Sequence, residues 1–230
     1  MVGRVAHRHH PFRDMLKLFR QEIVFQEGPL NDALTCQVIF YACGKEAVTE
    51  PTSALARGAV HKDIYESDIN LQISEVLSTT LGEMGAIVYM TRYGDYDLGV
   101  INALNRKRSD LSRRGNIINR SNCDLYISIH LNAVSSPVWY GAQVFYDDVH
   151  EENERLAKIM QEELARYLKT KRKYKKTNDM YLHKRIQHPG ILIEVGFLSN
   201  PNERYLLRQK YYQQKVSRAI ASGVVKFLIK

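Results

Sequence analysis

The sequence predicts an α/β fold: a single domain with a mixed, mostly parallel sheet of about six strands, flanked by helices on both faces. Short apolar runs of strand length alternate with longer segments in which apolar residues recur every three or four positions. This alternation favours parallel strands joined by covering helices. The length of 230 residues and the hydrophobic content of 44% suffice for one domain with a sizeable core.

The chain is basic, with 33 Lys+Arg against 25 Asp+Glu and a net charge of +8. Such a balance favours a polyanionic partner: nucleic acid, an anionic membrane face or an acidic polymer. Its three cysteines, Cys36, Cys43 and Cys123, are too few and too irregular for a disulfide framework. We expect no transmembrane segment and no signal peptide, because the chain lacks a long apolar run and its basic first residues lack an apolar core.

The N-terminal region divides into an appendage and the start of the domain. Residues 1–35 show weak periodicity and form an appendage of uncertain structure, whereas residues 36–230 form the predicted domain, which is recognisable from about residue 60. Residues 36–42 are apolar, β-branched and aromatic, which predicts a buried strand. Residues 43–62 mix Gly, Pro, Ser, Thr and charge without a period and predict a loop.

A helical period begins at Ile69 and continues to Met84, and Gly85 is expected to end that helix. Residues 86–90 then predict a strand. A polar stretch leads to Ser109, which we expect to cap the next helix.

Three further strands and two helices complete the predicted domain. The strands are 124–130, 140–146 and 190–197, the amphipathic helix is 152–168, and the C-terminal helix has one apolar stripe. In parallel sheets the ligand site lies beyond the carboxyl ends of the strands.

His130 and Asn132 place two polar side chains at the end of one predicted strand. A lone His on an apolar strand is usually a hydrogen-bonded core residue, and Asn132 shifts the balance towards a site. Both interpretations stay open on these residues alone.

Glu194 interrupts the most apolar predicted strand. A buried carboxylate is costly unless it is paired or bonded to a metal. A salt bridge, for example to Arg114, is one interpretation. A catalytic acid or base whose pKa is raised by apolar surroundings is the other, and we favour it.

Glu66 opens the 69–84 helix, where a carboxylate ordinarily complements the helix dipole. Together with His130 it makes part of a His/Glu zinc set, and catalytic zinc typically keeps three protein ligands. The basic run 169–176 has only Tyr174 available for stacking, so a solvated loop is favoured over a nucleic-acid site.

Four motifs occur in order along the chain: Ser-Asp-Ile-Asn-Leu after Glu66, Tyr-Ile-Ser-Ile-His-Leu-Asn-Ala at 126–133, Gly-Ala-Gln-Val-Phe-Tyr at 141–146 and Ile-Glu-Val-Gly-Phe-Leu-Ser-Asn at 193–200. In order and spacing they resemble the zinc-dependent N-acetylmuramoyl-L-alanine amidases of the family usually numbered three. Trp139 before Gly-Ala-Gln, the basic loop and Pro189 before Gly-Ile-Leu-Ile-Glu are most similar to the germination-specific, spore-cortex members.

The resemblance implies an α/β fold, one Zn²⁺ ion, and cleavage of the amide between the lactyl group of muramic acid and L-alanine. It implies zinc ligation by Glu66 and His130 and a catalytic role for Glu194, with substrate contacts from Asn132, Arg114 and the loop 93–107. It also implies a role in cortex maturation with muramic-lactam formation, peptidoglycan as the partner rather than nucleic acid, an accessory protein, and a location in the cell wall or spore cortex.

One motif of the family is missing. The first strand should end in Asp-Pro-Gly-His-Gly-Gly, whose His is a zinc ligand, but residues 38–46 contain no His. Three explanations are open. The N-terminal sixty residues could reflect a frame or start error, which we favour; another residue could complete the site, with Cys43, His61, His9 and His10 as candidates; or the protein could be a degenerate module that binds peptidoglycan or a partner without cleaving it.

Overall fold

The computed structural model describes residues 37–42, 60–61, 64–178 and 180–229. The six strands of the main sheet are β1 (Gln37–Ala42), β4 (Ile87–Met90), β5 (Leu125–Asn132), β6 (Gln143–Tyr146), β7 (Lys175–Lys176) and β8 (Gly190–Phe197). A separate two-stranded ribbon consists of β2 (Val60–His61) and β3 (Ile64–Tyr65). The helices are α2 (Glu66–Glu83), α3 (Arg106–Ser121), α4 (Asn153–Leu168), α5 (Pro201–Leu207) and α6 (Lys210–Leu228), with the short 3₁₀ helix η1 (His183–Arg185).

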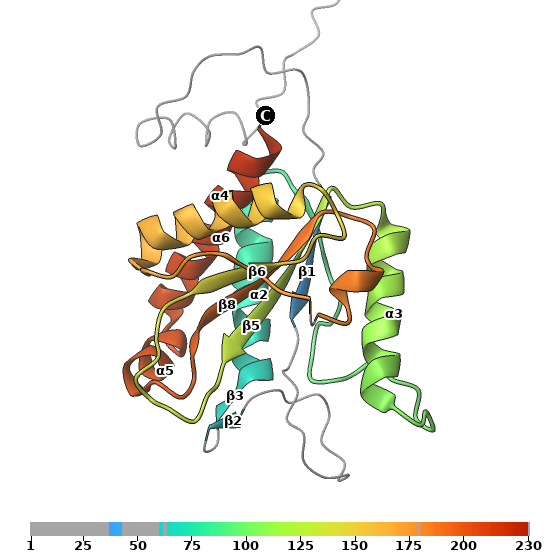
Figure 1. Cartoon of the computed structure of the whole chain (residues 1–230), viewed down its shortest axis with the longest axis horizontal. Helices are drawn as coiled ribbons and strands as arrows, with labels where there is room; N and C mark the ends of the chain where they lie inside the picture. The colour runs from blue at the N-terminus through green and yellow to red at the C-terminus, as the bar shows by residue number, and fades with distance from the viewer. Residues whose placement is uncertain (1–36, 43–59, 62–63, 179, 230) are drawn as a thin grey trace, which may run out of the picture.

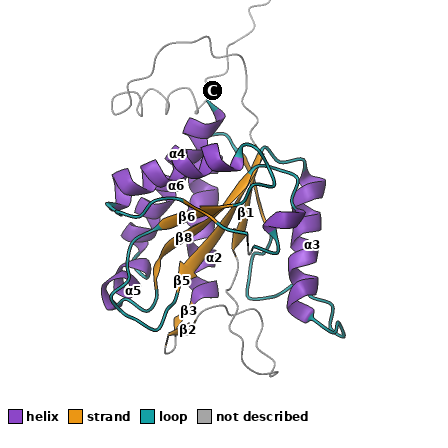
Figure 2. Cartoon of the chain, viewed as in Figure 1, coloured by secondary structure: helices purple, strands orange, loops and turns teal. Residues whose placement is uncertain are grey.

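The main sheet has the strand order β4-β1-β5-β8-β6-β7, and Figure 2 shows it running through the middle of the molecule. All of its neighbouring pairs are parallel except β6 and β8, which are antiparallel. The predicted mixed, mostly parallel sheet is therefore confirmed. Parallel neighbours require crossover connections, and the helices between the strands supply them.

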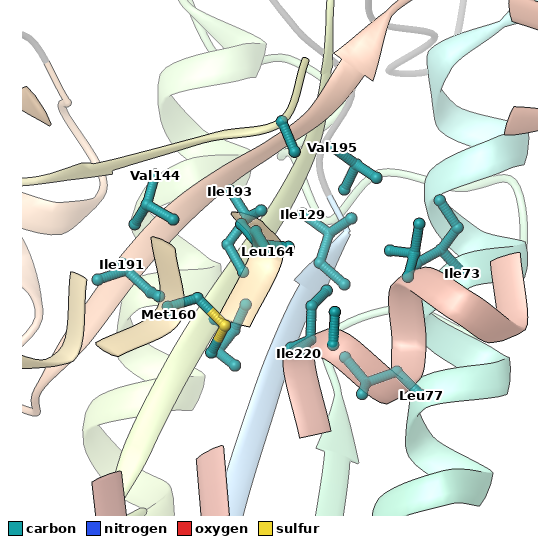
Figure 3. Close-up of a cluster of buried hydrophobic side chains, with 14 of the residues drawn as sticks. Ile73, Leu77, Ile129, Val144, Met160, Leu164, Ile191, Ile193, Val195 and Ile220 are labelled. Atoms are coloured by element: carbon teal, nitrogen blue, oxygen red, sulfur yellow. The ribbon is translucent and has the colours of Figure 1, made fainter. Parts of the chain in front are cut away.

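One face of the sheet is covered by α2, α4 and α6 (Figure 1). Ile127 and Ile129 of β5 and Ile191 and Ile193 of β8 are fully buried against these helices. Figure 3 shows Ile73, Leu77, Met160, Leu164 and Ile220 from the three helices meeting the strand side chains in one cluster. This apolar layer is the main core of the domain.

The opposite face carries α3, which stands apart from the other long helices in Figure 1. A second, smaller core joins Tyr126 of β5 to Ile118 of α3 and to Leu182 and Ile186 around η1. Because side chains alternate between faces along a strand, Tyr126 lies on the face opposite Leu125 and Ile127. Helices therefore cover both faces, as predicted.

The predicted helix at 69–84 begins three residues earlier than its apolar period, at Glu66, and ends where Gly85 was expected to stop it. Gly85 has φ = 89°. The amide of Ala86 donates to the carbonyl of Leu81, and the amide of Gly85 donates to the carbonyl of Gly82. This pair of bonds is a Schellman motif, in which a positive φ favours glycine.

The prediction that Ser109 caps the following helix was wrong. The structure begins α3 at Arg106, and the side chain of Asn105 accepts a hydrogen bond of 2.8 Å from the amide of Arg108. Asn is as good a cap as Ser and stands nearer the start of the helix. The hydroxyl of Ser109 instead accepts a bond from the amide of Val100, so it holds the preceding loop.

The predicted strand at 140–146 is shorter in the structure, because Gly141 forms a turn with φ = 94° before β6 begins. The short elements β2, β3, β7, η1 and α5 were not predicted from the sequence. The N-terminal appendage predicted for residues 1–35 lies outside the described residues. None of the helices in the described part of the chain is long and apolar enough to cross a membrane.

Candidate active site

Three polar side chains form a row across β5, β8 and β6. Glu194 of β8 is the Cα partner of His130 in β5 and of Gln143 in β6. Paired residues of neighbouring strands project to the same face of a sheet. Ile193 and Val195, which flank Glu194, point into the main core, so the row lies on the opposite face, the one that carries α3.

Glu66 completes this group from the first turn of α2. Its side chain is fully buried, and its Oε1 atom lies 3.1 Å from Nδ1 of His130. The same oxygen accepts hydrogen bonds from the amide of Leu131 at 2.9 Å and from Nδ2 of Asn70 at 3.2 Å. The helix N-terminus also favours a negative charge at this position. A buried carboxylate held in this way has a fixed position beside the imidazole.

His130 is oriented at both ring nitrogens. Nε2 lies 2.9 Å from the hydroxyl of Ser128, two residues earlier on the same face of β5, and Nδ1 faces Glu66. A regular strand places residues i and i+2 on one face, so the Ile-Ser-Ile-His alternation brings this hydroxyl to the ring. The strand shifts register just after His130, between His130 and Asn132.

Glu194 and His130 are almost completely buried, with exposed fractions of 2% and 5%. Two carboxylates and an imidazole therefore share a site from which water is largely excluded. Buried groups of this kind bind a cation or exchange protons, and electrostatic interactions among them are strong because the local dielectric is low. The arrangement is suited to hydrolysis assisted by a metal and a general base.

Arg114, the predicted substrate contact, comes from α3 rather than from the strands of this row. Its side chain is buried in α3, where Nε donates to both oxygens of Asp110, at 2.8 and 3.0 Å, and Nη1 donates to the hydroxyl of Thr91. These bonds fasten α3 to the end of β4. Asn132 lies at the end of β5, beside Phe197 of β8, and its carbonyl accepts from the amide of Leu198 at 2.7 Å.

The loop 93–107 leads from β4 into α3 and is fixed by polar side chains of the loop and of α3. The carboxylate of Asp110 accepts from the amide of Leu98, and that of Asp97 pairs with Arg106. Ile101 and Leu104 are among the most exposed apolar side chains of the described residues. The structure is thus compatible with this loop meeting a substrate, which stays a prediction.

Sequence reasoning missed Gln143, Ser128 and Asn70 as members of the site. Gln143 can be found only from strand pairing, since it becomes a neighbour of Glu194 through the antiparallel register of β6 and β8. Asn70 lies one helical turn after Glu66, and Ser128 lies two strand residues before His130. Once a first site residue is known, spacings of four in a helix and two in a strand point to both.

A third metal ligand is not among these residues. In the part of the chain that the structure describes, no three His, Cys, Asp or Glu side chains gather as a metal group. The predicted candidate Cys43 lies outside the described residues; it follows Ala42, which is the partner of Ile129 in β5. The candidate His61 belongs to β2, and its backbone pairs with Ile64, two residues before Glu66.

A buried Glu/His pair and a second carboxylate, in the carboxyl-terminal halves of the parallel strands β5 and β8 and at the start of α2, suit a hydrolase in an α/β domain. The family described as N-acetylmuramoyl-L-alanine amidase matches residues 49–226. The chain belongs to this family, and the predicted amidase class is confirmed.

Relatives from Bacillus subtilis and from Clostridioides difficile agree with this assignment. The germination-specific N-acetylmuramoyl-L-alanine amidase of Bacillus subtilis is 45% identical over 174 residues, which span 74% of this chain and 73% of that protein. The CwlD amidase from Clostridioides difficile, solved in complex with the GerS lipoprotein, is 35% identical with a TM-score of 0.73, over 83% of this chain and 98% of that one. An N-acetylmuramoyl-L-alanine amidase from Clostridium difficile is 26% identical with a TM-score of 0.70, over 84% of this chain and 97% of that one.

Proposed function

We propose that this chain is a zinc-dependent amidase that removes stem peptides from the muramic acid of peptidoglycan. Glu66 and His130 hold the zinc ion, and Glu194 transfers the proton. The observation that carries this proposal is the buried contact between Glu66 and His130, with Glu194 paired to His130 in the next strand.

The donor set suits zinc. Two ligands of one tetrahedral zinc ion, at metal distances of about 2.0 to 2.1 Å, lie about 3.3 Å from each other. The distance of 3.1 Å between Nδ1 of His130 and Oε1 of Glu66 is close to that value. The hydroxyl of Ser128 can accept the Nε2 proton of His130, which leaves Nδ1 as the donor atom. Metal-binding histidines almost always have such a second partner.

When bound, zinc polarises the scissile carbonyl and makes water more acidic. The residues of the chain supply the remaining steps. Glu194 accepts a proton from the attacking water as the new carbon–oxygen bond forms at the lactyl carbonyl. It then gives this proton to the amide nitrogen as the carbon–nitrogen bond breaks, which releases the amino group of L-alanine and leaves a lactyl carboxylate. The exclusion of water around Glu194 strengthens the electrostatic interactions on which both proton transfers depend.

The third ligand is proposed to come from Cys43 or His61. A thiolate and an imidazole are both good zinc ligands. Cys43 follows the strand that pairs with β5, and His61 belongs to the ribbon that leads into Glu66. The explanation by a frame or start error in the first sixty residues makes a different prediction, namely that peptides of that region are absent from the protein isolated from its natural source.

The biological setting proposed is the spore cortex, outside the cytoplasm, with muramic-lactam formation as the process served. The name of the 45% identical Bacillus subtilis relative, a germination-specific amidase, supports this setting. An accessory lipoprotein is proposed as a partner, because the related CwlD amidase was solved with the GerS lipoprotein.

Metal analysis of the purified full-length chain tests the proposal. We expect about one zinc ion per chain and release of stem peptides from peptidoglycan, both lost on chelation and restored by zinc. His130→Ala should lose both, whereas the matched variant His150→Ala on the distant turn before α4 should keep both. Cys43→Ser and His61→Ala then identify the third ligand, since only the true ligand should lower the zinc content.

The opposite outcome supports a second function. A folded chain that binds peptidoglycan but retains no zinc and releases no peptide, with or without a lipoprotein partner, would be a non-catalytic wall-binding module. This alternative is worth testing because only two of the three proposed zinc ligands, Glu66 and His130, lie together among the described residues.

A further inference from the structure

An exposed aromatic surface lies on the connection between β5 and β6. Trp139 and Tyr140 are 54% and 60% exposed, and Val134 and Val138 beside them are also exposed. Trp, Tyr and Arg are the residues most often responsible for binding energy at interfaces. We call Trp139, Tyr140 and Arg172 the aromatic rim.

Arg172 holds the rim together. Its guanidinium carbon lies 5.6 Å from the centre of the Trp139 ring and 4.6 Å from that of Phe197. Its Nε donates to the carbonyl of Tyr140 at 2.7 Å. A guanidinium stacked on aromatic rings gains cation–π energy and restricts their motion. Trp139 is therefore supported from within the protein while about half of its side chain stays accessible to a ligand.

The turn around Gly141, next to Trp139 and Tyr140, is also fixed by hydrogen bonds. The carboxylate of Glu203 accepts hydrogen bonds from the amides of Gly141 and Phe197, at 2.9 and 2.8 Å. Gly141 adopts φ = 94°, and a Cβ atom there would come within 2.7 Å of the hydroxyl of Thr170. A rigid aromatic surface loses little entropy when it binds.

The rim is continuous with the proposed active site. Nη1 of Arg172 donates to Oε1 of Gln143 at 3.1 Å, and Gln143 is the strand partner of Glu194. Phe197 follows Glu194 by three residues in β8, which corresponds to about 10 Å along a strand. A polymer whose amide bond lies at Glu194 and that runs along β8 towards Phe197 would pass Arg172 and Trp139.

We propose that the aromatic rim binds the glycan strand of peptidoglycan next to the muramic acid that is processed; the identity of this polymer rests on the proposed function. Sugar rings have apolar C–H faces that pack on aromatic rings and polar edges that accept hydrogen bonds. Arg172 and the exposed Lys171 and Lys173 complement the carboxylates of the polymer. The aromatic rim thus selects a glycan strand rather than a free muramoyl peptide.

Trp139 is the only tryptophan of the chain, so its fluorescence reports directly on this surface. The probe is peptide-free glycan strands, titrated into the full-length chain. We expect a saturable change in tryptophan emission, and no change with free stem peptides. Trp139→Ala should weaken binding of the glycan strands, measured by calorimetry, about tenfold or more, and Trp139→Tyr should retain most of it.

A matched control moves the reporter. In the double variant Trp139→Tyr/Tyr89→Trp, the single tryptophan lies on β4, at the other edge of the sheet, where Tyr89 is 45% exposed. Its emission should not respond to glycan strands.

Because the probe is not a substrate, the outcome is separate from that of the proposed function. Glycan-dependent emission from a chain without zinc or amidase activity would support the aromatic rim and overturn the proposed function. An active amidase whose tryptophan does not respond, or responds only to a protein partner, would overturn the proposal for the aromatic rim alone.

Discussion

The two faces of the central sheet are made from alternate residues of the same strands. Side chains on both faces are buried, but their neighbours differ. On one face of β5, Leu125, Ile127 and Ile129 pack against α2, α4 and α6. On the other, Ser128 and His130 are also buried, but they are hydrogen-bonded to each other, and His130 is also hydrogen-bonded to Glu66. Burial by itself does not separate the core of this protein from its chemistry; the partners of each side chain do.

The two faces should also respond differently to substitution. Removing an apolar side chain leaves a cavity and lowers the free energy of unfolding. Replacing a polar side chain of the other face by one of similar size keeps the volume of the side chain and changes only its chemistry. Variants on the two faces should therefore separate stability from activity.

Glu194→Gln should have the largest effect on activity. The amide preserves the size of the side chain but cannot accept the proton, so the rate of peptide release should fall roughly 100- to 10,000-fold. Zinc content and the free energy of unfolding should change little, as measured by metal analysis and urea denaturation. A matched Glu151→Gln variant on the surface should keep full activity, and residual activity in Glu194→Gln equal to that of the parent chain would exclude Glu194 as the proton-transfer group.

Ile127→Ala should have the opposite signature. Ile127 is fully buried in the main core, so its truncation should lower the free energy of unfolding by about 2 to 5 kcal/mol. The exposed Ile117 of α3 provides the control, and Ile117→Ala should change the free energy of unfolding by less than about 0.5 kcal/mol. Equal losses in the two variants would contradict the assignment of this face as the core.

Most of the fold could be predicted because long elements leave periodic patterns. The apolar period of α2, α4 and α6 and the dense runs of β5 and β8 identify them without tertiary information. The two-residue strands β2 and β7 leave no such pattern, since they are defined by pairing with neighbouring strands. The 3₁₀ helix η1 has three residues, which is too short to show a period. The cap of α3 was misplaced because Asn105 and Ser109 are both suitable caps.

The candidate site was predictable in part for a similar reason. Glu194 and His130 are polar residues in apolar strands, which is a local signal. Gln143 is brought to Glu194 only by the register of β6. The sequence also allowed a salt bridge between Arg114 and Glu194. The structure shows a salt bridge of Arg114 to Asp110, four residues earlier in the same helix α3.

Ser128→Ala tests whether the hydroxyl beside His130 raises the affinity of the site for zinc. Loss of the hydroxyl removes the partner of Nε2 of His130, and loss of such a partner typically lowers metal affinity about 10- to 100-fold. Competition with a chelator measures this affinity. Ser74→Ala removes an equally buried hydroxyl that bonds only a helix carbonyl in the described structure, and it should leave zinc affinity unchanged. A similar affinity in both variants would mean that Ser128 does not orient the ligand.

His183 gives the smallest expected effect and tests the second core beneath α3. Its ring is buried, Nδ1 lies 2.6 Å from the hydroxyl of Tyr126, and Nε2 has no hydrogen-bond partner among the described residues. Burial, and then the neighbouring His130, lower the pKa of His183 from 6.5 to about 3. Between these values the unfolded chain binds a proton that the folded chain does not, so stability falls as the pH falls below 6.5.

From pH 7 to pH 5 this residue should lower the free energy of unfolding by about 2 kcal/mol. His183→Leu removes the titrating group and keeps a side chain that fits an apolar site, so its stability should fall less over the same range. Urea denaturation of both chains at the two pH values measures the difference. Parallel pH profiles would show that His183 binds a proton in the folded protein as readily as in the unfolded chain, so that the face carrying α3 tolerates a charge at this position.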